Sequence, residues 1–255
     1  MSDNLIQWPK AKYWTKQWNP VIGCKPCSPA CENCYAAAWA KRFGQSFEPH
    51  ATKQKPPRSG IVFCGNMTDL FGEWRSSPEM VVTVRTPPRT HESQYLWLTK
   101  RVVNMVQSLR HIQDCFQTPG YWYGNHYFGF TAENQELYDR RFRESCQIPV
   151  WANWWISCEP LLGPIDLGLT DRHPITGSLG TLPHPPSWVV VGCESGPNRR
   201  PCKIEWVESI AQQCADADVP VFVKQLDIGG KCVADTTKFP KHLQIRQVPW
   251  AKEVL

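Results

Sequence analysis

Short, almost wholly apolar runs recur along the chain, and a polar or glycine-containing turn follows each of them. Runs of this kind are typical of strands that are buried on both faces of a parallel sheet. They predict strands over residues 21–24, 61–66, 95–100, 127–132, 154–160, 188–194 and 221–226.

Segments with helix-compatible patterns lie between these runs, and they predict helices over 36–44, 100–116, 132–146 and 204–218. The alternation of strands and helices favours a parallel α/β fold, and six or seven strands at this length suit a partial or full barrel. Two stretches rich in Pro, Gly and His, 48–60 and 168–187, are expected to be loop insertions. We see no internal repeat and no domain break, so we expect one domain over residues 1–255.

Composition narrows the class of protein. No apolar stretch approaches ~18 residues and the N-terminus lacks a signal-peptide pattern, so we expect a cytoplasmic protein with no membrane partner. In a reducing cytosol, clustered cysteines more often hold metal than form disulfides. The net charge of +5 permits an anionic partner such as nucleic acid without demanding one. Most of the 13 tryptophans are expected in the core, and some could stack on bases.

Polar residues gather just after the predicted strands. The carboxyl ends of the strands carry the active site in barrels and open α/β sheets, so residues from six successive strand ends predict one site. Each acid taken singly could equally cap a helix or pair with a neighbouring arginine. The residues are Asn66, Thr68, Asp69, Lys100, Arg101, Thr131, Glu133, Asn134, Glu159, Glu194, Ser195, Lys224 and Gln225.

Four cysteines follow the first predicted strand with the spacing C-x2-C-x3-C-x2-C, from Cys24 to Cys34. Three thiolates this close can hold an iron–sulfur cubane or complete a zinc site, although four-cysteine zinc sites usually pair their knuckles across a longer stretch. The subset Cys27, Cys31 and Cys34 has the C-x3-C-x2-C spacing with which radical S-adenosylmethionine (SAM) enzymes bind a [4Fe–4S] cluster. The loop opens onto the same rim as the polar residues.

Longer motifs in a fixed order extend this pattern over residues 18–249. They are WNPVIGC, SPACENCYA, GNMTDLF, LTKR, FTAENQ with DRR, SCEPLLGPIDL, VVVGCESGPNRRP, QQC, VFVKQ and FPKHLQIRQVP. Together they resemble a phage- and prophage-borne family of radical-SAM-like proteins, mostly of unassigned function, whose nearest understood relative is spore photoproduct lyase. The resemblance implies a partial (β/α)6-type TIM barrel of the radical SAM superfamily.

The resemblance also implies ligands and roles. The family's glycine-cysteine, six residues and C-x2-C pattern selects Cys24, Cys31 and Cys34, whereas spacing alone selects Cys27 in place of Cys24, and both sets remain open. Lys100 resembles the lysine that faces the SAM carboxylate, and Thr131 lies where a hydroxyl reaches the ribose or carboxylate. The implied cofactor-binding residues are completed by Asn66, Thr68 and Ser195; Glu133, Glu159, Glu194 and Lys224 remain for substrate and catalysis.

The expected activity is reductive cleavage of SAM at a [4Fe–4S] cluster, supplied with electrons by a flavodoxin- or ferredoxin-type donor. The 5′-deoxyadenosyl radical would modify or rearrange a nucleic-acid base or nucleotide, as in phage DNA hypermodification. Arg172, Arg199 and Arg200 are the expected DNA contacts. The alternatives are a radical SAM enzyme acting on a small molecule or peptide, and a zinc- or cluster-stabilised nucleic-acid-binding module without catalysis.

Overall fold

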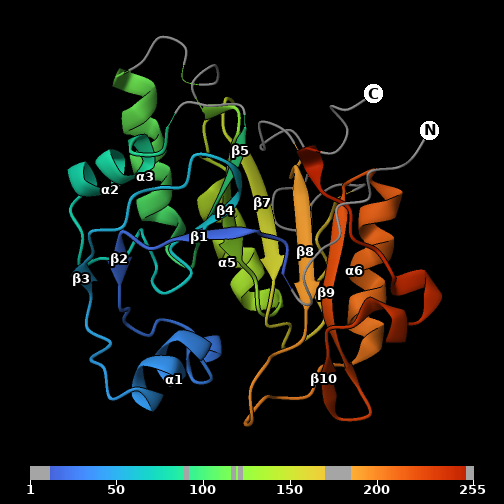
Figure 1. The fold of residues 1–255 in the computed structure, drawn as a ribbon. Coiled ribbons are helices and arrows are strands. Elements are labelled where there is room, and N and C mark those ends of the chain that lie inside the picture. The colour runs from blue at the N-terminus through green and yellow to red at the C-terminus, as the bar shows by residue number, and fades with distance from the viewer. Residues whose placement is uncertain (1–11, 89–91, 116–118, 120–122, 170–184, 251–255) are drawn as a thin grey trace.

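A computed structural model describes residues 12–88, 92–115, 119, 123–169 and 185–250. Its centre is an eight-stranded sheet that curls into a half-barrel (Figure 1). Seven strands run parallel, and the last pairs antiparallel with its neighbour. In sheet order the strands are β1 (Lys16–Trp18), β4 (Gly60–Cys64), β5 (Ser93–Thr99), β6 (His126–Thr131), β7 (Asn153–Cys158), β8 (Trp188–Gly192), β9 (Val221–Ile228) and β10 (Lys231–Val233).

The predicted α/β class and six of the seven predicted strands are confirmed, whereas the first predicted strand, 21–24, is confirmed only at residues 21–22 and does not belong to the main sheet. Val21–Ile22 (β2) leaves the sheet and pairs antiparallel with His50–Ala51 (β3). The edge position belongs to β1, whose three residues lack a long apolar run. The 48–60 stretch therefore contains a short strand, and most of the 168–187 stretch lies outside the described residues.

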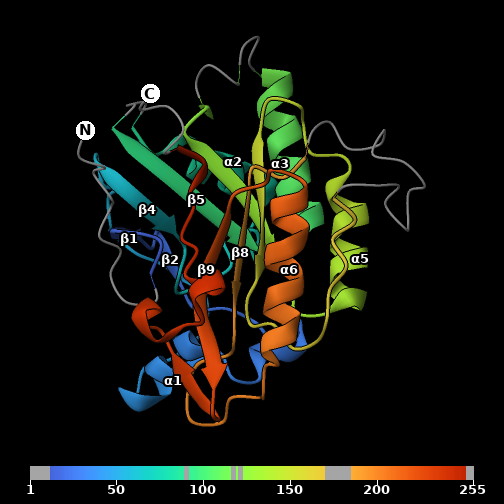
Figure 2. The same cartoon turned by 90° about the vertical axis from the view of Figure 1, so that its right-hand side faces the viewer.

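Within the described residues, four α-helices cover the outer face of the sheet, namely α2 (Ser77–Arg85), α3 (Val102–Cys115), α5 (Gln135–Ser145) and α6 (Ile204–Asp216) (Figure 2). A further helix, α1 (Tyr35–Arg42), lies apart from them, below the carboxyl ends of the strands. The sequence reasoning missed α2, although its N-terminus is a capping box: Ser76 N donates to Glu79 Oε2 (2.8 Å) and Glu79 N to Ser76 Oγ (3.4 Å). No helix in the described ranges is long and apolar enough to cross a bilayer.

Alternation along the strands builds a core on each face of the sheet. Outward residues such as Trp97, Trp154 and Val191 pack under the helices. Inward residues form a smaller aromatic core, in which the Tyr13 ring meets Trp188 edge-on at 5.1 Å. The inner core consists of Tyr13, Ile61, Phe63, Leu96, Tyr127, Trp155, Trp188, Val190, Phe222 and Val248. It fills the amino-terminal half of the concave face, and the polar strand ends lie beyond it.

Gly129 on β6 makes room for this inner core. A Cβ at Gly129 would lie 2.5 Å from the indole of Trp155, which crosses it from the neighbouring strand β7. Trp155 Nε1 donates to the backbone oxygens of Tyr127 and Trp97, both at 3.1 Å. The bulky ring is thus held flat against β6 because that strand has no side chain there.

Candidate functional site

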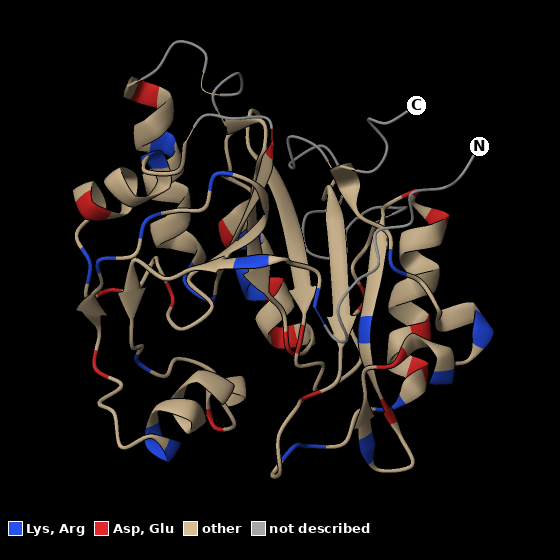
Figure 3. Ribbon diagram, in the orientation of Figure 1, with Lys and Arg blue, Asp and Glu red and all other residues tan. Residues whose placement is uncertain are grey.

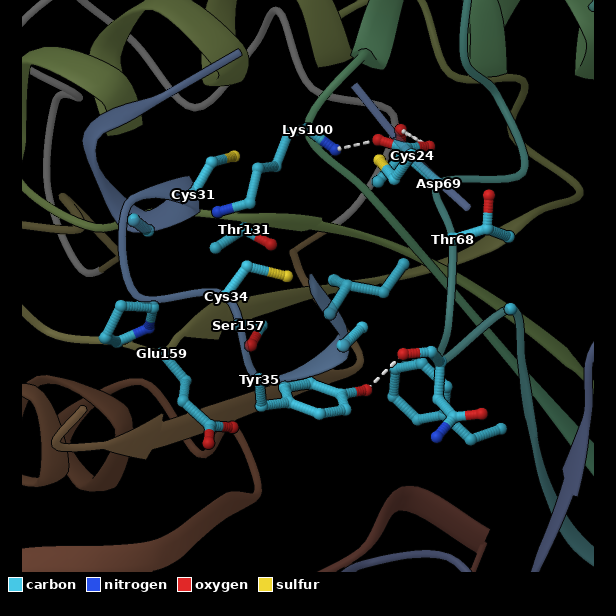
Figure 4. A pocket seen from close by; sticks show the side chains of 18 of the residues that line it. Cys24, Cys31, Cys34, Tyr35, Thr68, Asp69, Lys100, Thr131, Ser157 and Glu159 are labelled. Atoms are coloured by element: carbon cyan, nitrogen blue, oxygen red, sulfur yellow. Dashed lines mark hydrogen bonds between the residues drawn. The ribbon is translucent and has the colours of Figure 1, made fainter. Parts of the chain in front are cut away.

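A cavity opens at the carboxyl edge of the half-barrel, on the concave side of the sheet (Figure 4). It contains about 1140 Å³ of empty space, including the part that is open to solvent. Aromatic and aliphatic side chains, Tyr13, Trp14, Phe63 and Leu98, line one part of it. Ends of six strands and the cysteine loop, defined here as residues 23–34, supply the other walls.

Twelve residues were predicted as cluster ligands, cofactor contacts or substrate and catalytic residues, and eleven of them line this cavity. They are Cys24, Cys31, Cys34, Asn66, Thr68, Lys100, Thr131, Glu159, Glu194, Ser195 and Lys224. The twelfth, Glu133, is completely buried and is not among the lining residues. Cys27, the alternative cluster ligand, is exposed and does not line the cavity either.

Glu133 fastens the cysteine loop to the sheet. Its carboxylate accepts a hydrogen bond from Ser28 Oγ of the loop (2.6 Å) and forms ion pairs with Lys100, which directly follows β5, and with Arg141 on α5 (2.5 Å). Burial alone would raise the pKa of Glu133, but Lys100 and Arg141, with Ser28, outweigh it and lower that pKa to about 2. The carboxylate therefore stays charged and holds the Lys100 ammonium at the cavity wall.

Glu194 holds the other end of the loop. Its carboxylate accepts from Asn33 Nδ2 (2.9 Å) and forms an ion pair with Arg200 (2.5 Å). Burial opposes ionisation here too, yet the bonds from Arg200 and Asn33 lower the pKa of Glu194 below its usual value. Arg199 is likewise engaged, with Asp227 at 2.8 Å. Two of the three arginines expected to contact DNA are thus paired inside the protein, and Arg172 lies outside the described residues.

Two further strand ends reach the first part of the loop. Thr68 Oγ1 donates to Gly23 O (2.5 Å), and Arg101 donates to Lys25 O (2.8 Å). Gly23 has a φ of +93°, and a Cβ there would lie 2.3 Å from the backbone oxygen of Glu48, so only glycine fits. The loop therefore rests on the ends of β4, β5, β6 and β8.

Asp69 orders the turn that follows β5. Its carboxylate accepts from Thr99 Oγ1 (2.7 Å), Lys100 N (2.9 Å) and the Arg101 guanidinium (3.2 Å). Asp69 and Arg101 are 6% and 8% exposed, so this pair is shielded from water. The turn presents Lys100 to the cavity and Arg101 to the loop.

The opposite wall carries a second charged pair and an unsatisfied hydroxyl. Lys224 on β9 pairs with Glu159 after β7, and its ammonium lies 5.7 Å from the ring centre of Trp14. Ser157 Oγ is buried and has no hydrogen-bond partner among the described residues. Ser157 lies beside Thr131 in the β6–β7 register, and Figure 4 shows both between Lys100 and Glu159.

Sequence reasoning missed Ser157, Trp14, Ser28, Asn33 and Arg141. The signal for Ser157 was present, because strand alternation in WWISCE puts it on the same face as Trp155 and Glu159. The others act through contacts between distant segments, and no local pattern marks those.

A family model described as a protein of unknown function, DUF5131, matches residues 8–248. The chain belongs to the DUF5131 family. No curated protein and no solved structure matches it. The matched range includes every residue that lines the cavity.

The thiols of this DUF5131 protein differ in their acidity. Hydrogen bonds from Cys27, together with the Lys100 charge and Ser28, lower the pKa of Cys31 to about 4 despite its burial. Burial and Asp69 instead raise the pKa of Cys24 to about 11. Cys31 is therefore a thiolate at neutral pH, the form that binds metals, whereas Cys24 must lose a proton on binding.

The donor set suits a soft metal group. Three thiols of the cysteine loop face the cavity, and thiolates select iron–sulfur clusters and zinc. Within the described ranges, however, no three His, Cys, Asp or Glu side chains are gathered as they would be around a single ion. The chemistry of these residues fits a cluster bound by Cys24, Cys31 and Cys34.

Proposed function

We propose that the protein is a radical SAM enzyme with a partial (β/α)6-type barrel, in which Cys24, Cys31 and Cys34 bind a [4Fe–4S] cluster. The observation that carries this proposal is the cavity itself. Three thiols of one loop line it, and polar side chains from six strand ends surround them. A cluster held there would supply one electron for the reductive cleavage of SAM to methionine and a 5′-deoxyadenosyl radical.

The structure favours Cys24 over Cys27 as the third ligand, because Cys24 lines the cavity and Cys27 does not. Cys27 has another use. Its backbone N–H points to Cys31 Sγ at 3.5 Å, and such hydrogen bonds to sulfur tune the potential of iron–sulfur clusters.

The chain's own residues bind and orient SAM. The Lys100 ammonium, a compact charge held by Glu133, suits the SAM carboxylate. Thr131 and the unpartnered hydroxyl of Ser157 offer hydrogen bonds to the sugar, and Asn66, Thr68 and Ser195 complete the contacts. On the opposite wall, Glu159 and Lys224 remain for the substrate, and the apolar lining keeps water from the radical. The electron comes from a flavodoxin- or ferredoxin-type donor.

Anaerobic purification tests the proposal. We expect a brown protein with about four irons per chain. With dithionite and SAM it should form 5′-deoxyadenosine and methionine, measured by mass spectrometry. A colourless protein that contains zinc and forms neither product would contradict the proposal.

Cysteine variants test the ligand set. Cys24→Ser, Cys31→Ser and Cys34→Ser should each lose iron, because a hydroxyl is a poor substitute for a soft thiolate. Cys27→Ser is the matched control and should keep its iron. Iron retained in Cys24→Ser but lost in Cys27→Ser would instead support the plain C-x3-C-x2-C set.

The second candidate is a metal-stabilised nucleic-acid-binding module without catalysis. The basic net charge favours it, and the absence of a gathered single-ion ligand group in the described residues weighs against its zinc form. The product assay separates the two, since a module would not cleave SAM.

A further inference from the structure

Helix α1 presents a row of exposed aromatic rings. Tyr35, Trp39 and Phe43 follow one another at four-residue intervals, about one helical turn, and are 55%, 45% and 56% exposed. We call them the aromatic ridge. In the part of the chain that the structure describes, no other Phe, Trp or Tyr side chain is exposed to this degree. The Trp39 and Phe43 rings lie 4.8 Å apart.

The burial of α1 is the reverse of a usual amphipathic helix. The small residues Ala36 and Ala40 face inward, at 3% and 2% exposure, while the large rings face water. Fully burying a large apolar side chain stabilises a fold by about 1.5–3 kcal/mol, so each of the three half-exposed rings leaves part of this gain unused. Large exposed apolar patches of this kind mark binding surfaces.

The ridge is continuous with the cavity. Tyr35 belongs to both, because its ring lines the cavity while its hydroxyl bonds to the backbone oxygen of Asn66 (Figure 4). It also follows Cys34 directly in the chain. A ligand that lies along the ridge is therefore led into the cavity beside the thiols.

Positive charge concentrates on the same stretch. Residues 35–60 hold five Lys and Arg and one Glu, a net charge of 5 − 1 = +4 against +5 for the whole chain. All five cations are exposed; two lie in the last turn of α1, and the other three lie in the segment between β3 and β4. Figure 3 shows Lys and Arg colouring at the end of α1 and along the chain that leads to β4. Arg42 also lies 5.8 Å from the centre of the Phe43 ring. The cations are Lys41, Arg42, Lys53, Lys55 and Arg58.

We propose that the aromatic ridge binds single-stranded nucleic acid and leads one of its bases into the cavity. Proteins bind single strands with aromatic rings that stack on the bases and with cations that contact the phosphates. Every base has a π-face and every linkage has a phosphate, so such a surface binds strands of any sequence. A duplex hides those faces in its own stack. The inference rests on the proposed function, whose substrate class it names.

Fluorescence anisotropy with labelled single strands of about 12 nucleotides tests the inference. The reconstituted protein should bind oligo-dT or oligo-U more tightly than a duplex of equal length, with an affinity that falls as salt rises. The better of the two probes tells DNA from RNA. No binding to either strand at low salt, or equal binding of the duplex, would overturn it.

Variants of Trp39 separate stacking from general apolar contact. Trp39→Leu should weaken binding about 5- to 150-fold, the loss that corresponds to one stacked base, whereas Trp39→Phe should stay within a few-fold of the wild type. Val82→Ala removes exposed apolar surface on α2 and should change nothing. If Trp39→Leu binds like the wild type, the ridge does not stack on bases, as expected of a surface for an acidic partner protein.

The double variant Lys41→Glu with Arg42→Glu reverses two charges beside the ridge and leaves its rings in place. It should reduce both the affinity for the strand and the salt dependence of that affinity, and unchanged binding would count against the inference.

Iron content and SAM cleavage with dithionite, measured on the same samples, keep the two proposals apart. Cleavage without strand binding refutes the ridge alone, and strand binding without cleavage refutes the radical enzyme alone.

Discussion

Replacing Glu133 by glutamine should be among the most destabilising conservative changes in the rim. The buried carboxylate is paired with both Arg141, at 2.5 Å, and Lys100, and Arg141 is itself 0% exposed. Glutamine keeps the shape of the side chain but leaves the arginine charge buried without a counter-charge. Removing one partner of a buried ion pair costs about 3–5 kcal/mol, and we expect that loss of unfolding free energy at pH 7.

The lowered pKa of Glu133 determines how the stability that this carboxylate contributes changes with pH. The pKa of Glu133 is lowered to about 2 in the folded protein from an ordinary 4.5, so its stabilisation is complete above pH 4.5. It is lost as the pH falls from about 4.5 towards 2, because the carboxylate of the unfolded chain takes up a proton over this range while that of the folded protein stays charged. Glutamine has no proton to take up, and the gap between wild type and Glu133→Gln should narrow over this range.

Urea unfolding followed by circular dichroism at pH 7 and pH 3 measures both effects. Glu159→Gln is the matched control, since the Glu159–Lys224 pair is partly exposed, at 16% and 14%, and its loss should cost less. The reasoning would be refuted if Glu133→Gln matched the control at pH 7, or if its deficit stayed constant in acid.

Two other changes probe the cavity and its floor. Lys100→Ala should leave the iron content unchanged and weaken SAM binding by roughly 1.5–3 kcal/mol in calorimetry, the range for a hydrogen bond to a charged group; unchanged affinity would remove Lys100 from the SAM site. Gly129→Ala should lower the free energy of unfolding by about 1–3 kcal/mol, because its Cβ would lie 2.5 Å from the Trp155 indole. Gly163→Ala, whose Cβ would lie 3.6 Å from the Asn134 side chain, should have little effect, and equal losses in the two would refute the steric argument.

The sheet was largely predictable because its central strands are apolar on both faces. A short run that is apolar throughout, such as WVVVG, is compatible with few structures other than a buried strand. The edge strand β1 was not, since three residues with one hydrogen-bonded neighbour carry no periodicity. Helix α2 could have been found from Ser76 and Glu79, three residues apart, with a proline between them.

The sequence was sufficient to predict which residues gather at the site, but not what each of them does there. Chain order places Glu133 and Glu159 alike at strand ends. Only the fold reveals that Glu133 turns back to Arg141 and the cysteine loop, while Glu159 faces the cavity. These contacts join residues 8 and 105 positions apart, and a choice between partners at such separations depends on packing rather than on local pattern.

Four of the bonds that fix the cysteine loop to the rim have a consequence for how the protein can be maintained. They come from Thr68, Arg101, Ser28 and Asn33, and none of them uses a thiol. In small zinc domains the metal orders its own ligands, so its loss unfolds the domain. Here folding itself orders the loop. If oxygen destroyed a cluster bound there, the cysteine loop would keep its position. The same protein molecule could then bind a new cluster instead of being degraded.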